Sequence, residues 1–188
     1  FSTRSTKQVK LLVLFATKNS IIMVAIMFIK IPIPFTQGYV HPGDAMIFLA
    51  VLVLGWKYGA AAAAFGAMLG DVMGGFAAWA PWTFGIKGIM AIILGLIIEM
   101  AFRKEGRSRN SVMAFIIIGM VIAGAFMTAG YYVAEGIMYG NWVVAALGIP
   151  WNIGQFVVGM VLALIIAEAL LKTPAKKYFT YRLPAKNE

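Results

Sequence analysis

The most constraining feature of this sequence is a series of apolar runs long enough for helices to cross a lipid bilayer. Spanning about 30 Å of hydrocarbon takes roughly 20 helical residues. Six candidate spans lie at residues 11–29, 45–54, 58–77, 82–102, 111–139 and 150–171. The sequence therefore predicts an all-α integral membrane protein, with six transmembrane helices in one compact bundle and a single membrane domain over residues 1–188.

Composition agrees with a bilayer environment. Of the 188 residues, 62% are hydrophobic and 12% are charged, whereas about 25% of the residues in a typical soluble domain are charged. The span at residues 45–54 is short, so its neighbours must shield it, it must tilt, or it must cross incompletely. We count it as a crossing because the alternation of charged loops requires one there.

Lys and Arg residues fall on one side of the membrane when the loops are alternated. Of the 16, only Lys18, Lys30 and Lys87 lie inside or at the end of spans. The others form one set: Arg4, Lys7, Lys10, Lys57, Arg103, Lys104, Arg107, Arg109, Lys172, Lys176, Lys177, Arg182 and Lys186. Because basic loops stay in the cytoplasm, both termini are predicted to be cytoplasmic. Orientation explains the net charge of +9 better than binding to nucleic acid does.

Several chemistries are disfavoured by what the sequence lacks. It has no cysteine, and its one histidine, His41, makes a metal cage or a Ser-His relay hard to build. It contains neither H-E-x-x-H nor G-x-S-x-G, and no G-x-x-x-x-G-K-[ST] phosphate loop. We therefore expect no catalytic residues, no metal and no cofactor, and any ATP must be hydrolysed by another chain.

Polar residues gather towards the outer ends of the spans, where each ionisable group is a candidate functional residue. Thr128, Tyr131, Tyr132 and Glu135 share one helical face. Lys87, Asp71, Asn152 and Gln155 lie at a similar depth, and Asp44 opens the second span. The inner halves of the fourth and sixth spans are almost wholly aliphatic. This asymmetry predicts a pocket that opens outwards, in place of a channel.

Lys87 has two compatible interpretations. It either forms a buried ion pair with Asp71 or Glu135 that locks the bundle, or donates to a ligand while a carboxylate keeps it charged. The outer tryptophans also allow two interpretations, a belt at the membrane interface or a stacking surface for a flat heterocycle. We assign stacking to Trp79 and Trp82, and leave Trp142 and Trp151 open.

The external segment at residues 31–43 contains three prolines and two glycines, so it cannot be helical. It is either a plain connector or a lid over the pocket, with Gln37, Tyr39 and His41 as candidate contacts. We favour the lid, because connections in bundles are usually shorter.

Small residues mark possible helix contacts. Gly66, Gly70 and Gly74 repeat at intervals of four and favour close packing inside the bundle. Ala16 and Ser20 form a second small pair on the first span. The adjacent Lys18 either snorkels inwards or meets an acidic residue of another protein.

The order of motifs resembles a known family. The segments "GYVHPGDAMIFLAVLVLG", "KYGAAAAAFGAMLGDVMGG" and "WAPWTFGIKGIMAIILG" are similar to those of S components, the vitamin-capturing subunits of energy-coupling factor (ECF) transporters. The resemblance covers nearly the whole chain. The stretch "WAPWTFGIKG" looks most like the hydroxymethylpyrimidine or pyridoxine type.

The resemblance implies a non-enzymatic subunit of the prokaryotic cell membrane, surrounded by lipid. It would bind its vitamin from outside, beneath the first loop, and dock on one transmembrane coupling (T) subunit and two ATPases. The family's small-residue motif on the first helix maps to Ala16 and Ser20, although serine departs from the usual alanine. The ligand region maps to Trp79, Lys87, Tyr131, Glu135, Asn152 and Gln155. The alternatives are an autonomous facilitator or channel and, less favoured, an intramembrane enzyme.

Overall fold

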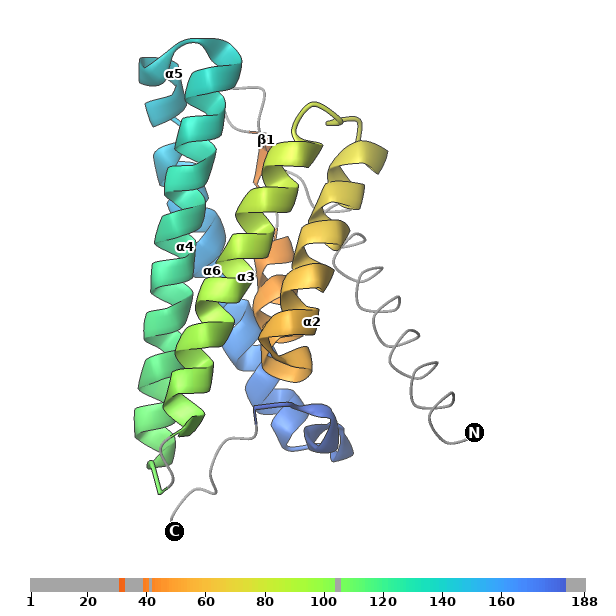
Figure 1. Cartoon of the computed structure of the whole chain (residues 1–188), viewed down its shortest axis with the longest axis vertical. Helices are drawn as coiled ribbons and strands as arrows, with labels where there is room; N and C mark the ends of the chain where they lie inside the picture. The colour runs from red at the N-terminus through yellow and green to blue at the C-terminus, as the bar shows by residue number, and fades with distance from the viewer. Residues whose placement is uncertain (1–30, 33–38, 41, 104–105, 182–188) are drawn as a thin grey trace.

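The structure is a computed structural model in which residues 31–32, 39–40, 42–103 and 106–181 are described. A short antiparallel pair, β1 (Ile31–Pro32) and β2 (Tyr39–Val40), precedes the helices. The helices are α2 (Gly43–Met73), α3 (Ala80–Arg103), α4 (Arg109–Tyr139), α5 (Trp142–Ala146) and α6 (Ile149–Leu171), followed by the 3₁₀ helix η1 (Pro174–Tyr178). The long helices lie side by side, with α5 at one end of the bundle (Figure 1).

Four helical segments among the described residues are long and apolar enough to cross a membrane: Gly43–Met73, Ala80–Arg103, Arg109–Tyr139 and Trp142–Leu171. Apolar side chains also cover their outer faces, where Ile118, Val158 and Ile165 are all more than half exposed. A helix that is apolar on every face suits lipid on one side and a protein core on the other.

Helix α2 is interrupted at Gly55, which has φ 77° and ψ 171°. A positive φ of this kind favours glycine, because a Cβ would clash there. Beyond Gly55 the chain turns back on itself, since a Cβ at Gly59 would lie 2.8 Å from the Cα of Val51. The expected spans 45–54 and 58–77 thus fall on two packed halves of α2. The second half ends at Met73, so residues 74–77 form a turn where the sequence predicted helix.

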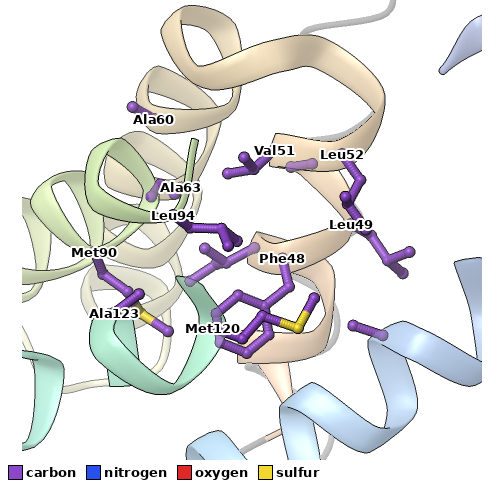
Figure 2. Packing of buried hydrophobic residues seen from close by; sticks show 14 of the residues in the cluster. Phe48, Leu49, Val51, Leu52, Ala60, Ala63, Met90, Leu94, Met120 and Ala123 are labelled. Carbon is purple, nitrogen blue, oxygen red and sulfur yellow. The ribbon is translucent and has the colours of Figure 1, made fainter. Parts of the chain in front are cut away.

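The core lies where α2 meets α3, α4 and α6. Phe48, Met90, Leu94 and Met120 are fully buried there and pack together (Figure 2). Close approach depends on glycine at a few positions. A Cβ at Gly124 of α4 would overlap the ring of Phe156 on α6, so this glycine lets the two helices pack closely.

The end of the bundle opposite α5 carries most of the basic side chains. Apart from Lys87, the Lys and Arg residues in the described ranges are Lys57, Arg103, Arg107, Arg109, Lys172, Lys176 and Lys177. Arg109 of α4 donates to Glu168 of α6 at 2.8 Å. We call this the basic end.

The segment after η1 lies across the basic end and supplies hydrogen-bond donors at the break in α2. A helix break leaves backbone carbonyls without their usual partners. The N–H of Thr180 donates to the carbonyl of Val53 at 3.0 Å, and the N–H of Tyr181 donates to that of Leu52 at 3.3 Å. A cavity of about 20 Å³ remains between Leu52 and Tyr181. It would hold about one water and is far too small for a vitamin.

Candidate functional site

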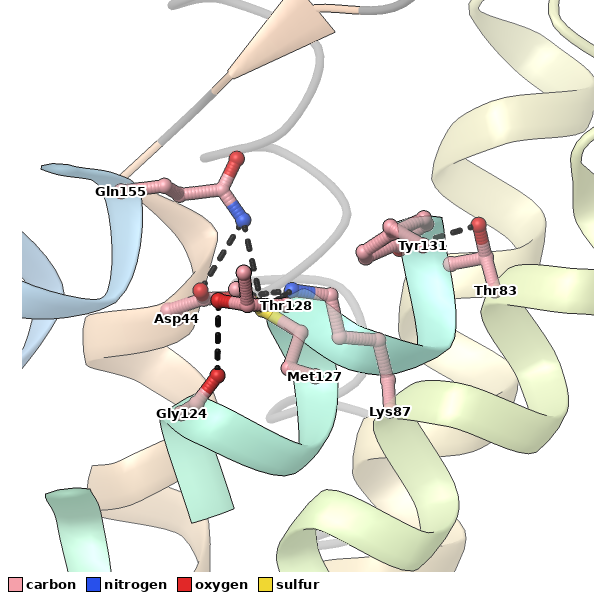
Figure 3. A network of polar contacts seen from close by, with 8 residues as sticks. All are labelled: Asp44, Thr83, Lys87, Gly124, Met127, Thr128, Tyr131 and Gln155. Atoms are coloured by element: carbon pink, nitrogen blue, oxygen red, sulfur yellow. Dashed lines mark hydrogen bonds and ion pairs between the residues drawn. The ribbon is translucent and has the colours of Figure 1, made fainter. Parts of the chain in front are cut away.

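A buried ion pair joins the start of α2 to the middle of the bundle. Lys87 Nζ on α3 lies 2.5 Å from Asp44 Oδ1, and both side chains have 0% exposure. Gln155 of α6 donates to the other carboxylate oxygen, Asp44 Oδ2, at 2.9 Å. Asp44 therefore links α2 to both α3 and α6 through its side-chain contacts (Figure 3).

Lys87 has further contacts on α4. Its ammonium group donates to Met127 Sδ at 2.8 Å and lies 5.3 Å from the centroid of the Tyr131 ring. Burying one charge alone in a membrane protein is costly, so such groups pair with one another or with polar neighbours. The pairing of Lys87 and Asp44 leaves this cluster without net charge and ties four helices together.

An aromatic group lies beside the ion pair. The ring of Trp79 is 6.2 Å from that of Tyr131 and 6.1 Å from that of Tyr139. The hydroxyl groups of Tyr131 and Thr83 are 3.2 Å apart and share a hydrogen bond. Centroid separations of this size are typical of tilted and edge-to-face aromatic pairs. The three rings place flat apolar surface next to the polar side chains.

Glu135 and Asn152 form a second polar region, between α4 and the start of α6. Glu135 is 2% exposed and Asn152 is 6% exposed. The Asn152 side chain donates to the carbonyl of Gly148 at 3.1 Å. Within the described part of the chain, Glu135 Oε2 is buried without a hydrogen-bond partner. A carboxyl group in this state costs free energy, which makes Glu135 a strong candidate for ligand contact.

Comparison with known proteins identifies the chain. The model of the family described as "ECF-type riboflavin transporter, S component" matches residues 6–172. The chain belongs to this family of S components. It is therefore a multi-pass protein of the prokaryotic plasma membrane and a transport subunit that functions in vitamin uptake, not an enzyme.

Relatives of this S component agree with the assignment. The thiamine precursor transporter HmpT of Lactococcus lactis subsp. cremoris (strain MG1363) is 29% identical over 168 residues, covering 89% of this chain and 91% of HmpT. A Pyrococcus woesei protein described as "Uncharacterized protein in gap 3'region" is 34% identical over 119 residues, 63% of this chain and 74% of that protein.

Two solved structures share the fold. One is the S component of a bacterial ECF transporter, with a TM-score of 0.63 and 23% identity over 88% of this chain and 99% of that one. The other is the S component for biotin from an ECF-type ABC transporter, with a TM-score of 0.65 and 16% identity over 93% of this chain and 97% of that one. At these identities the likeness concerns the fold alone.

The structure brings most of the predicted site residues of this S component close together. Lys87, Gln155 and Tyr131 lie in the ion-pair cluster, with Trp79 beside it. Trp82 is half-buried at the start of α3, and Trp142 and Trp151 are 49% and 39% exposed.

The predicted partner of Lys87 was wrong. Neither Asp71 nor Glu135 forms the ion pair, which Asp44 makes instead. Asp71 lies near the C-terminal end of α2 and is buried. Asp44 lies at the start of α2, and the packing of α2 against α3 decides which carboxylate reaches Lys87.

Sequence reasoning also missed Met127, whose thioether accepts from Lys87. A methionine on an apolar helix gives no signal of such a role. Asp44 did give one, as an acidic residue directly before an apolar run, but it was interpreted only as the start of a span. The predicted contacts Ala16, Ser20, Gln37 and His41, and also Lys18, fall outside the described residues, and Tyr39 is described only as backbone in β2.

Proposed function

We propose that this S component binds a small planar vitamin or vitamin precursor, of the hydroxymethylpyrimidine or pyridoxine kind, from outside the cell. It then delivers the ligand through a T subunit coupled to two ATPases. The observation that carries the proposal is the convergence of Asp44, Lys87 and Gln155, from three helices, beside the Trp79 and Tyr131 rings. Aromatic surface with a few placed polar groups is the usual make-up of a small-molecule site.

The proposed orientation places the basic end in the cytoplasm, because Lys and Arg residues are retained there. The aromatic group would then face outwards. Residues 31–43 would close over it as a lid, with Gln37, Tyr39 and His41 as contacts. Ala16 and Ser20 on the first helix would contact the T subunit.

The names of the similar proteins do not agree on a substrate, since they mention riboflavin, a thiamine precursor and biotin. HmpT supports the pyrimidine, because it is 29% identical over 168 residues, whereas the biotin component is 16% identical and shares the fold alone. We include Trp82, Glu135 and Asn152 with the residues above as ligand contacts.

The binding half of the proposal is tested by calorimetry on the purified chain with B vitamins and pyrimidine precursors. We expect one of these compounds to bind with a dissociation constant in the micromolar range or below. Binding by none of them would contradict the proposal. The transport half is tested in liposomes. Uptake should require the T subunit and the ATPases, whereas uptake by this chain alone would favour a facilitator. The fully buried Met90, Leu94 and Met120 beneath the site argue against an open path.

A further inference from the structure

None of the side-chain contacts described above involves the carboxyl group of Glu135, which is also part of the proposed site. Lys87, Asp44 and Gln155 satisfy one another, and Thr83 pairs with Tyr131. Glu135 is only 2% exposed, and its Oε2 has no hydrogen-bond partner among the residues described. A buried carboxyl oxygen without a partner loses its hydration and gains nothing in return. A ligand that supplied the missing partner would recover that free energy.

The surroundings of Glu135 define what such a ligand would look like. Tyr131 and Tyr139 lie four residues before and after it on α4, so all three share one helical face. Trp79 contacts both tyrosine rings. On the other side, a Cβ at Gly148 would lie 2.7 Å from Glu135 Oε2. Glu135 therefore shares a helical face with two of the aromatic residues, and its carboxyl group lies against Gly148, the residue before α6.

We propose that Glu135 selects a planar heterocycle that carries an amino group beside a ring nitrogen. This inference rests on the proposed function and specifies its ligand. The amino N–H would donate to one carboxyl oxygen, while the other oxygen and the ring nitrogen would share one proton. Two hydrogen bonds form whether that proton resides on the acid or on the ring. A ring without the amino group would leave one oxygen of Glu135 unpaired.

The test combines a change in the protein with a change in the ligand. Calorimetry on the purified full chain compares 4-amino-5-hydroxymethyl-2-methylpyrimidine with the same compound carrying hydrogen in place of the amino group. We expect the wild-type protein to prefer the amino compound by roughly tenfold to a hundredfold, as for hydrogen bonds to a charged group. Glu135→Leu should bring that ratio near one. Glu135→Gln should retain most of it, because an amide also offers one donor and one acceptor.

Glu168→Leu is the matched control, since it removes a carboxyl group at the basic end and should leave the ratio unchanged. A melting curve verifies that each variant is folded. A wild-type ratio near one, an unchanged ratio in Glu135→Leu, or a loss in Glu135→Gln as complete as in Glu135→Leu would overturn the inference. Tighter binding of riboflavin or biotin than of either pyrimidine would overturn it while leaving the binding function intact. Failure of every vitamin and precursor to bind would overturn both.

Discussion

Lys87 and Asp44 are 43 residues apart in the chain, yet their charged groups meet at 2.5 Å with no exposure of either side chain. The pair fixes the start of α2 against α3. Because Gln155 also donates to Asp44, α6 is held at the same point. A contact of this kind joins three helices of the bundle at the proposed site.

Asp44→Asn should destabilise the protein strongly. It leaves the Lys87 ammonium buried without its counter-ion, a change that costs about 3–5 kcal/mol. The melting temperature in detergent should fall by roughly 6–20 °C. Asp44→Asn combined with Lys87→Met should recover much of this loss, because no buried charge then remains.

Arg103→Gln is the control for that experiment. Arg103 is 72% exposed and lies 3.5 Å from Glu99, and an exposed ion pair contributes at most about 1 kcal/mol. Equal effects of Asp44→Asn and Arg103→Gln would show that the buried pair contributes no more than a surface one.

Glu135→Leu should stabilise the ligand-free protein. It replaces a buried oxygen that has no hydrogen-bond partner in the described structure with apolar atoms. The free energy of unfolding should rise by about 1–3 kcal/mol, the cost of leaving such an oxygen unpaired. Thermal melting should show an increase of a few degrees. A decrease would mean that the carboxyl group is already satisfied without ligand.

Gly124→Ala should disrupt the contact between α4 and α6. Its methyl group would overlap the Phe156 ring, and overpacking of this kind costs about 1–3 kcal/mol. Gly154→Ala is the matched control, because nothing lies within 4 Å of a Cβ there and alanine favours a helix. The comparison is made by thermal melting, and a similar loss in both variants would point to a general effect of glycine replacement.

Thr180→Pro should loosen the break in α2. It removes the N–H that donates to Val53 and the hydroxyl that donates to the same carbonyl at 2.8 Å. Thr180→Val removes only the hydroxyl bond. At about 0.5–1.5 kcal/mol per hydrogen bond, the proline variant should lose more stability and exchange the amide hydrogens after Gly55 faster. Identical exchange in both variants would contradict a role for the backbone bond.

Ser20→Trp should separate binding from transport. If Ala16 and Ser20 face the T subunit, a bulky side chain would prevent close helix approach. Vitamin binding by the isolated chain should remain, whereas co-purification with the T subunit and coupled uptake should be lost. Phe15→Trp, on the same predicted span, is the control, and equal loss in both would contradict the assigned contact.

Part of the fold and of the site could be predicted from sequence because hydrophobicity and charge act locally. Runs of apolar residues predicted the long helices. The clustering of the basic residues in a few loops predicted that they would lie at one end of the bundle. Ionisable residues inside such runs are rare and costly, so Lys87 and Glu135 were identifiable without coordinates. The motif order was also sufficient to indicate the S-component family.

What the sequence could not provide was the choice of partner for each polar group. Depth estimated along the chain allowed Lys87 to pair with Asp71 or Glu135, because all three lie at a similar level. In the folded bundle, the packing of α2 against α3 brings Asp44, at the start of α2, into contact with Lys87. The sequence by itself determined which segments enter the membrane, since that depends on the free energy of transfer of each side chain. Only the tertiary structure decided which charge is neutralised and which carboxyl oxygen lacks a hydrogen-bond partner among the described residues, since that depends on distances between helices.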